Sequence, residues 1–266
     1  MDESIEKVCP VCGKPRFKMM DFPLLDGRDG FEKREVKIMC DCEIAARNER
    51  DERERREKEI ALIHDLKKLS LIDERLSGVN FSTCKVDESN SKMIGIARKY
   101  VDNFDEMYKE CQGLLFFGDV GTGKSYIAAA IANELMNRLI PVVMTSFVRL
   151  LQEMQGFETD NTEFIQRLNR AKLLVIDDLG AERGTDYALE RVYEVIDSRY
   201  RSKKPIILTT NMQYKAMQEC QDIRYVRIYD RIFEMCYPVK FTGKSWRKKD
   251  AVDRFGRMSE LFAECS

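Results

Sequence analysis

The sequence predicts an α/β protein in three layers: a parallel sheet with helices on both faces, preceded by a small cysteine-rich module and a charged helix. From about residue 80 onward, short apolar runs alternate with amphipathic segments of helical length. Strands separated by helices of this length pair in parallel through right-handed crossovers. Before residue 80, cysteines gather in one stretch and charges in the next. We therefore expect three parts, residues 1–42, 43–79 and 80–266.

Length and composition exclude several classes of protein. The chain has 266 residues, of which 44% are hydrophobic and 34% charged, and its formal net charge is −1. This apolar content excludes wholesale disorder, and the charge excludes a histone-like polycation. The start of the chain lacks a signal-peptide pattern, and no apolar run approaches the ~18–20 residues of a membrane span. We expect a cytoplasmic protein with no membrane partner, whose nine cysteines form no disulfide framework.

Four cysteines near the start have the spacing of a metal site. Cys9 and Cys12 form a C-x-x-C-G motif. Cys40 and Cys42 supply a second pair with the shorter C-x-C spacing. A segment of this length buries too little surface to fold alone, so a bound metal would supply its stability. Four thiolates fit zinc best, and an iron–sulfur centre and free thiols are the alternatives.

A charged segment follows, in which acids and bases recur at helical spacing. Four i,i+4 pairs place the acid first, the more favourable orientation, at ~0.2–0.5 kcal/mol each. One interpretation is a solvated helical linker. The alternative is a partner-binding helix, because its later half carries an apolar stripe that could dock on another surface. The pairs are Glu49/Arg53, Asp51/Arg55, Glu52/Arg56 and Glu54/Lys58, and the stripe is Ile60, Ile63, Leu66 and Leu69.

The remaining elements are predicted from runs of apolar residues and from their period. In the cysteine-rich module, we expect a hairpin turn at residues 26–30 and a short strand that includes Val36 and Ile38. In the main domain, strands are predicted at residues 113–117, 141–144, 172–176, 205–209 and 239–242. Helices are predicted at residues 124–138, 146–155 and 161–170, and where Leu189, Val192, Tyr193, Ile196 and Tyr200 recur.

A phosphate-binding motif lies between the first of these main-domain strands and the helix that follows. Its glycines allow the loop to wrap closely, so that successive backbone N–H groups face the phosphates. Lys124 would reach the β- and γ-phosphates, Ser125 would ligate Mg²⁺, and the helix N-terminus adds a favourable dipole. The sequence therefore predicts an ATP and magnesium site. Its residues are Gly118, Asp119, Val120, Gly121, Thr122, Gly123, Lys124 and Ser125.

Two acids and one amide follow later strands of the sheet. Asp177 and Asp178 come after four apolar residues, at the carboxyl end of a buried strand. Asp177 would hold the magnesium ion and its water shell, and Asp178 would act as base toward the attacking water. With the acidic strand central in the sheet, Asn211 could orient the same water. These roles predict a P-loop ATPase that converts ATP to ADP and phosphate.

These motifs together resemble the AAA+ ATPases of the DnaC/DnaI helicase-loader family, to which the transposition helper IstB is related. The resemblance implies a P-loop AAA+ fold, with Asn211 at the sensor-1 position and Arg247 in a terminal sensor-2 segment that touches the nucleotide. Glu is commoner in the family at the position of Asp178, which leaves the rate of hydrolysis open. The residues that carry the resemblance are 118–125, 173–180, 209–211, 227–232 and 245–247.

The resemblance also implies an oligomer. Residues 227–232 are similar to the family's Arg-x-x-x-Asp-Arg helix, in which Arg231 is the arginine finger that reaches a neighbouring subunit's γ-phosphate. Arg224 and Arg227 are the alternatives. Such a finger stabilises charge in the transition state and places each active site between subunits.

The function implied is ATP-dependent loading of a hexameric DnaB-type replicative helicase onto single-stranded DNA, by a ring or spiral of this chain. Some loaders carry an N-terminal zinc module that contacts the helicase. One alternative is an IstB-like transposition helper, which shares the ATPase core. Another is a nucleotide-switched adaptor with little turnover.

Two regions are candidates for single-stranded DNA. Residues 240–257 hold seven basic and two acidic residues, a local charge of +5. Charge and aromatic stacking together grip single strands, although a solubilising tail is the alternative. The aromatic residues of this region are Phe241, Trp246 and Phe255. The resemblance implies a second region that includes Phe147, Arg149, Arg167 and Arg170.

Overall fold

The computed structural model describes residues 7–24, 29–70, 74–87, 90–156, 161–181 and 185–263. These residues belong to two compact units, residues 1–58 and 59–266. The long helix α1 (Asp41–Leu69) contributes its first part to one unit and its last part to the other. Each helix that the structure describes is too short or too polar to cross a bilayer.

The first unit contains an antiparallel hairpin. Strand β1 (Phe17–Pro23) pairs with β2 (Phe31–Lys37) along their whole length. The expected strand near Val36 is confirmed but begins earlier, and residues 26–28 of the expected turn lie outside the described residues. Most side chains of both strands are exposed. Because an isolated two-stranded hairpin is marginal in water, this hairpin depends on what is attached to it.

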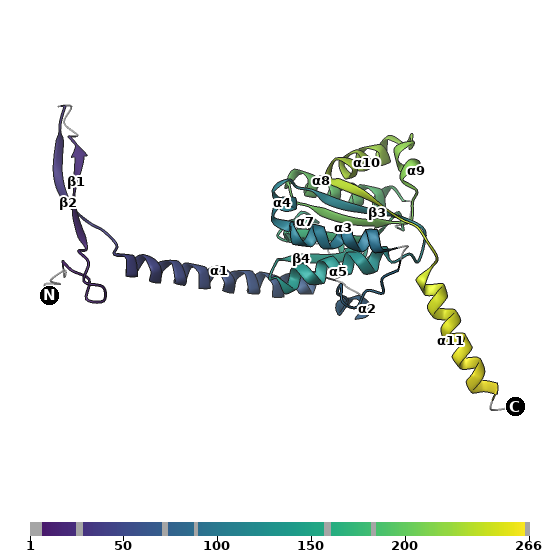
Figure 1. The fold of residues 1–266 in the computed structure, drawn as a ribbon. Coiled ribbons are helices and arrows are strands. Elements are labelled where there is room, and N and C mark those ends of the chain that lie inside the picture. The colour runs from purple at the N-terminus through teal and green to yellow at the C-terminus, as the bar shows by residue number, and fades with distance from the viewer. Residues whose placement is uncertain are drawn as a thin grey trace. The chain divides into compact units, whose positions relative to one another are not determined.

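The second unit is built on a five-stranded sheet in which every neighbouring pair of strands is parallel (Figure 1). The order is β4-β5-β6-β3-β7, so the middle strand is β6. The expectation that the acidic strand β5 is central is therefore wrong, because β5 lies between β4 and β6. All five strands overlap the predicted runs. They are β3 (Gly113–Gly118), β4 (Val142–Ser146), β5 (Leu173–Leu179), β6 (Ile206–Thr210) and β7 (Cys236–Phe241).

Helices cover both faces of the sheet, which confirms the three-layer α/β fold. Alternate residues of each strand point to opposite faces, so Phe116 joins one hydrophobic cluster and Leu115 the other. The first cluster takes in α3 (Ser91–Asp102), α4 (Phe104–Lys109) and α5 (Lys124–Asn137). The second takes in α6 (Phe147–Gly156), α7 (Asn161–Leu168), α8 (Asp186–Arg201), α9 (Tyr214–Gln218) and α10 (Ile223–Met235).

The apolar stripe of α1 has a partner within the chain. Leu66 is fully buried in the second cluster and Ile63 is buried, whereas Ile60 is 52% exposed. Asp65, on the same part of the helix, forms ion pairs with Arg170 at 3.3 Å and Arg167 at 4.0 Å. The end of α1 therefore packs within the second unit of its own chain.

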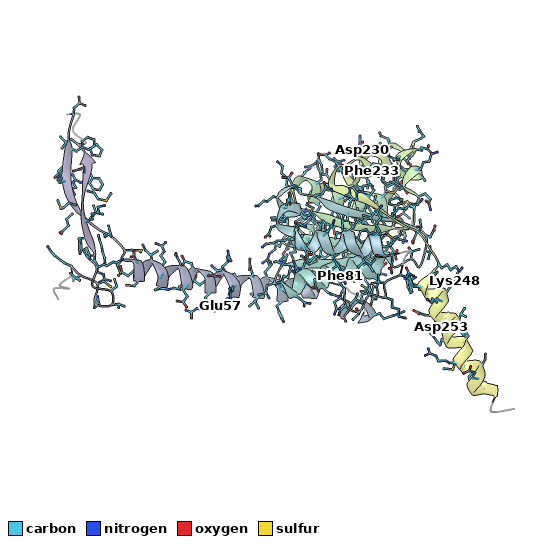
Figure 2. All side chains as sticks on the ribbon, in the orientation of Figure 1. Glu57, Phe81, Asp230, Phe233, Lys248 and Asp253 are labelled. Atoms are coloured by element: carbon cyan, nitrogen blue, oxygen red, sulfur yellow. The ribbon has the colours of Figure 1, made fainter. Side chains whose placement is uncertain are left out.

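Five described helices of the second unit lie outside the predicted set. They are α2 (Glu74–Ser77), the amphipathic α3, α4, α9 and the terminal α11 (Trp246–Ala263). Figure 2 labels Phe81, which is buried in the first cluster, and Lys248 and Asp253, whose side chains are exposed on α11. Farther along α11, Val252, Phe255 and Phe262 are each about two thirds exposed, so these apolar side chains pack on none of the described residues.

Candidate functional site

The phosphate-binding motif forms the loop between β3 and α5, as the sequence predicts. Gly118, Gly121 and Gly123 have φ angles of 123°, 82° and 97°, which L side chains rarely adopt. A Cβ atom at Gly118 would lie 2.1 Å from the Phe241 carbonyl oxygen. At Gly121 it would lie 2.1 Å from Ser245 Oγ. The loop therefore needs glycine for its conformation and for its close contact with the C-terminal segment.

Lys124, the first residue of α5, folds back over this loop. Its Nζ atom donates hydrogen bonds to the carbonyl oxygens of Gly118 at 2.9 Å and Asp119 at 2.7 Å. Burial lowers the pKa of Lys124, and the charges of Asp178, Asp119 and Asp177 oppose this effect. A cation held only by carbonyl oxygens is free to exchange them for phosphate oxygens, which are stronger acceptors.

The loop opens into a cleft of about 670 Å³ that gathers most of the predicted site. The carboxyl ends of β5 and β6 meet the loop at this edge of the sheet, as in other open parallel sheets. Arg247, at the start of α11, reaches the same cleft. The predicted residues that line it are Val120, Gly121, Thr122, Gly123, Lys124, Ser125, Asp177, Asp178, Asn211 and Arg247.

The acid pair is the electrostatic centre of the cleft. Burial raises the pKa of Asp178, and the neighbouring charge of Asp177 raises it further, while Arg247 and Lys124 oppose the rise. Asp177 Oδ1 accepts a hydrogen bond of 2.5 Å from the Thr209 hydroxyl. The carboxylate of Asp177 is thus held by a hydrogen bond, and the carboxylate of Asp178 binds a proton more readily than that of an exposed aspartate.

Sequence reasoning missed the residues at the far end of the cleft. They come from α2, from the start of α3 and from the segment between these helices, where Asn90 is buried and donates a 2.8 Å hydrogen bond to the Lys85 carbonyl. These residues extend the lining of the cleft beyond the phosphate loop. No phosphate-type motif marks them, since they meet the loop only after folding. They include Arg75, Leu76, Thr83, Cys84, Lys85, Asn90 and Ile94.

Several predicted DNA contacts are corrected by the structure. Phe147 and Phe241 are buried in the two hydrophobic clusters, so both predictions of DNA contact are wrong. The backbone N–H of Trp246 donates to the Gly121 carbonyl at 2.9 Å, and its ring lies beside the phosphate loop. Arg149 also lines the nucleotide cleft. Phe255 remains exposed on α11.

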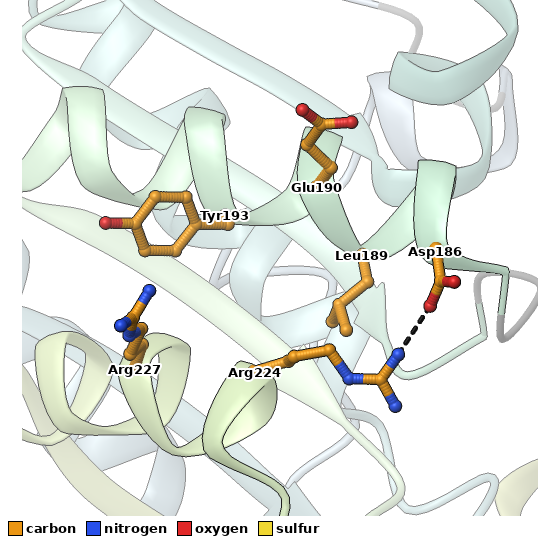
Figure 3. Close-up of a pocket in the computed structure, with 6 residues that line it drawn as sticks. All are labelled: Asp186, Leu189, Glu190, Tyr193, Arg224 and Arg227. Carbon is orange, nitrogen blue, oxygen red and sulfur yellow. Dashed lines mark hydrogen bonds and ion pairs between the residues drawn. The ribbon is translucent and has the colours of Figure 1, made fainter.

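The three candidate finger arginines lie on α10, and none of them lines the nucleotide cleft of its own subunit. Figure 3 shows two of them, Arg224 and Arg227, facing α8. Arg224 and Arg227 line a second pocket of about 380 Å³ between α8 and α10. Arg224 is paired with Asp186 and Asp222. The remaining lining residues are Leu189, Glu190 and Tyr193.

Arg231 is held inside its own subunit. Its guanidinium forms an ion pair with Asp197 at 2.7 Å. It also donates a hydrogen bond to the Tyr193 hydroxyl at 3.1 Å and stacks over that ring, with its centre 4.9 Å from the ring centroid. Arg227, one turn earlier, is exposed.

The four N-terminal cysteines come together in the first unit. All four Sγ atoms lie within 4.8 Å of one another. Two pairs are closer, Cys40 to Cys42 at 3.0 Å and Cys9 to Cys42 at 3.4 Å. Thiolates around a tetrahedral zinc ion would be about 3.8 Å apart. The donor set and its spacing therefore fit a bound metal.

Local backbone and charge prepare the cluster for a cation. Backbone N–H groups of Cys12 and Val11 face the sulfur of Cys9 and lower its pKa to about 6. Behind the thiols, Glu43 accepts a 3.2 Å hydrogen bond from the Cys40 N–H and pairs with Arg16. Such outer contacts fix the orientation of metal ligands.

Comparison with known proteins identifies relatives that match more than half of this chain. Phage-like element PBSX protein XkdC of Bacillus subtilis is 31% identical over 52% of this chain and 53% of its own length. The replicative helicase loader DnaC of Escherichia coli is 29% identical over 58% and 62%. The replicative helicase loader DnaI of Bacillus subtilis is 26% identical over 68% and 62%. The matches span less than two thirds of each of these relatives.

Solved structures show the same fold. The crystal structure of DnaI, 27% identical, superposes with a TM-score of 0.56 over 68% of this chain and 98% of that one. The DnaC helicase loader, also 27% identical, gives 0.52 over 64% and 100%. DnaA of Aquifex aeolicus bound to AMPPCP, at 20% identity over 71% and 57% and a TM-score of 0.54, shares the fold alone.

These likenesses confirm the P-loop AAA+ fold and the resemblance to DnaC/DnaI loaders and IstB. The family model for IstB-like ATP binding proteins matches residues 33–253, which is most of the chain. The chain therefore belongs to the family of IstB-like ATP-binding proteins.

Proposed function

We propose that the protein loads a hexameric DnaB-type replicative helicase onto single-stranded DNA, with ATP binding and hydrolysis controlling assembly and release. The observation that carries the proposal is the cleft itself. It joins the phosphate loop, both acids, Asn211 and Arg247 in a chain whose relatives include proteins named helicase loaders. We further propose that it acts in the cytoplasm.

In this proposal, each predicted residue of the cleft has a role in ATP hydrolysis. Lys124 and the backbone of residues 118–125 bind the phosphates, and Arg247 contacts them from α11. Ser125 and Asp177 would hold Mg²⁺, which neutralises phosphate charge when it is bound. Asp178 takes a proton from the attacking water, and Asn211 orients that water.

A neighbouring subunit completes the site in this proposal. The family pattern assigns the arginine finger to Arg231, which here is paired with Asp197. The ion pair would have to break on assembly for Arg231 to reach the nucleotide of a neighbouring subunit. Arg227 is already exposed on the same helix. We propose a ring or spiral in which α10 supplies the finger.

The N-terminal parts would hold the helicase. Residues 1–42 form a zinc-binding module through Cys9, Cys12, Cys40 and Cys42, and residues 43–79 link it to the ATPase domain of residues 80–266. We propose that the exposed basic helix α11 binds single-stranded DNA, through charge and Phe255. Arg167 and Arg170, which pair with Asp65 and stay partly exposed, are a second candidate.

Capture of partners tests the proposal against the IstB-like alternative. The full chain, immobilised with ATP, is presented with a DnaB-type hexamer and, separately, with a transposase of the kind that IstB-like helpers serve. We expect the helicase to be retained and the transposase to be lost. Retention of the transposase alone would favour the transposition helper. Lys124→Ala, which removes the phosphate-binding cation, is the matched control for nucleotide dependence.

Turnover tests the adaptor alternative. We expect ATP hydrolysis in the presence of helicase and single-stranded DNA, and a fall of about 10²–10⁴-fold in Asp178→Ala, since a positioned base contributes that much. A wild-type rate no higher than that of Asp178→Ala would favour a nucleotide-switched adaptor.

A further inference from the structure

The two acids of the cleft are adjacent in the sequence, and in a regular strand they could not both point into the same cleft. Successive side chains of a strand point to opposite faces, yet Asp177 and Asp178 both line the cleft. The pairing of β5 with β6 shifts register between Ile176 and Leu179, and Asp178 has a φ angle of 56°. This bulge turns Asp178 to the same side of the sheet as Asp177.

The bulge has a cost in hydrogen bonding and backbone conformation. An extra residue is left out of the ladder between the strands, so its N–H group needs another acceptor. A left-handed conformation at a residue other than glycine is also unfavourable, and it persists only where the surroundings hold it. Something beside Asp178 must therefore stabilise this conformation.

Thr209 on β6 forms a hydrogen bond with each of the two acids, and one of these bonds satisfies the N–H group that the bulge leaves out of the ladder. Its hydroxyl oxygen accepts the Asp178 N–H at 3.0 Å and donates to Asp177 Oδ1 at 2.5 Å. A hydroxyl has one proton. Because the Asp178 N–H is the donor in the first hydrogen bond, that proton is directed to Asp177. Thr209 is fully buried and is not among the residues that line the cleft, so it acts through the acids.

We infer that Thr209 is a positioning residue for the acid pair: one hydroxyl fixes the backbone of Asp178 and the carboxylate of Asp177 together. With Oδ1 of Asp177 held by this hydrogen bond, its other oxygen would be left to ligate the proposed Mg²⁺. This inference rests on the proposed ATPase function, but the hydrogen bonds that carry it exist without nucleotide.

Three variants separate positioning from simple packing. Thr209→Val keeps the shape and removes the hydroxyl, whereas Thr209→Ser restores it. Thr210→Val is the matched control, because Thr210 is also fully buried and makes two hydrogen bonds. Its hydroxyl donates to the Leu179 carbonyl at 2.7 Å and accepts the Met212 N–H at 3.1 Å, neither of which involves an acid side chain.

The first readout needs no ATP. Amide hydrogen exchange at Asp178, in the full chain free of magnesium and nucleotide, should be faster in Thr209→Val than in the wild type and slow again in Thr209→Ser. Thr210→Val should leave that amide protected. Unchanged protection of Asp178 in Thr209→Val would overturn the inference whether or not the protein hydrolyses ATP.

The second readout is the magnesium requirement. Binding of a fluorescent ATP analogue is titrated with Mg²⁺, and turnover is measured at saturating ATP. Loss of an outer contact to a metal ligand typically costs about 10–100-fold in affinity or activity. We expect a shift of that size in the Mg²⁺ midpoint and in kcat for Thr209→Val, with KM for ATP little changed. Equal losses in Thr209→Val and Thr210→Val would show a merely structural role and overturn the inference.

Discussion

Asp178 is the residue whose environment most directly sets the chemistry of the cleft. Burial and the adjacent charge of Asp177 both favour its protonated form, while Arg247 and Lys124 favour the carboxylate. The raised pKa makes Asp178 a stronger base than an exposed aspartate, and this suits proton abstraction from water near neutral pH. Because the side chain of Asp is one methylene shorter than that of Glu, its placement by the bulge matters more.

A pH profile tests this assignment. A protonated Asp178 cannot accept a proton, so kcat/KM for ATP should fall as the pH drops through its raised pKa. We expect this acid limb to lie above the value of about 4 of an ordinary aspartate. Arg247→Ala removes a charge that opposes the rise and should move the limb to still higher pH. A limb at or below the ordinary value, or one that moves down in Arg247→Ala, would contradict the assignment.

The site residues that could be predicted from the sequence are those that lie in short motifs. The phosphate loop, Asp177 and Asp178 are recognised by their spacing, because neighbouring residues of the chain form each part of the site. Thr209 and Trp246 act through partners brought close only by the sheet, so no local pattern shows their contacts. Arg199 is a further case: it is fully buried and donates to the carbonyl oxygens of Pro205, Ala171 and Lys172.

Among the elements, the N-terminal hairpin is the one that depends most on something outside its own packing. Its side chains are mostly exposed, and the thiol cluster lies where the chain enters and leaves it. The cysteine spacing predicted the cluster, since ligand pairs are local. The full length of β1 and β2 was not predictable in this way, because neither strand alternates cleanly between apolar and polar residues.

Metal removal tests the role of the cluster. We expect one zinc per chain by elemental analysis of protein purified under reducing conditions. Chelation, or Cys40→Ser, should abolish amide protection across β1 and β2 while β3 stays protected, because β3 lies in a separate hydrophobic core. Cys111→Ser, outside the cluster, is the control. Metal-free protein with an ordered hairpin would contradict a structural zinc site.

The strands of the sheet were predictable because buried parallel strands are short apolar runs. Helices α3 and α11 were not predicted, for two different reasons. Helix α3 buries Met93, Ile94, Ala97 and Tyr100 at helical spacing, a signal that the sequence did contain. Helix α11 was missed because its basic charges suggested only a tail. Its apolar side chains Val252, Phe255 and Phe262 are exposed in the described part of the chain.

For the whole molecule, the way in which subunits assemble decides which arginine of α10 acts as the finger. Arg231 is tied to Asp197 in the isolated chain, and Arg227 is exposed. We expect ATP-dependent assembly in light scattering, weakened by loss of the finger, together with a fall in turnover of about 10³–10⁵-fold. Arg224→Ala, Arg227→Ala and Arg231→Ala are compared, because each of these arginines is a candidate for the finger. An oligomer and a turnover unchanged in all three variants would contradict a finger on this helix.

The central claim is that the protein places a replicative helicase on single-stranded DNA in an ATP-dependent step. The most direct measurement is DNA unwinding by a DnaB-type hexamer on a forked substrate, with and without the full chain and ATP. We predict that unwinding begins faster with the wild-type chain and ATP, and that Lys124→Ala gives no such gain. Unwinding at the same rate with wild type, with Lys124→Ala and with the helicase alone would contradict the account.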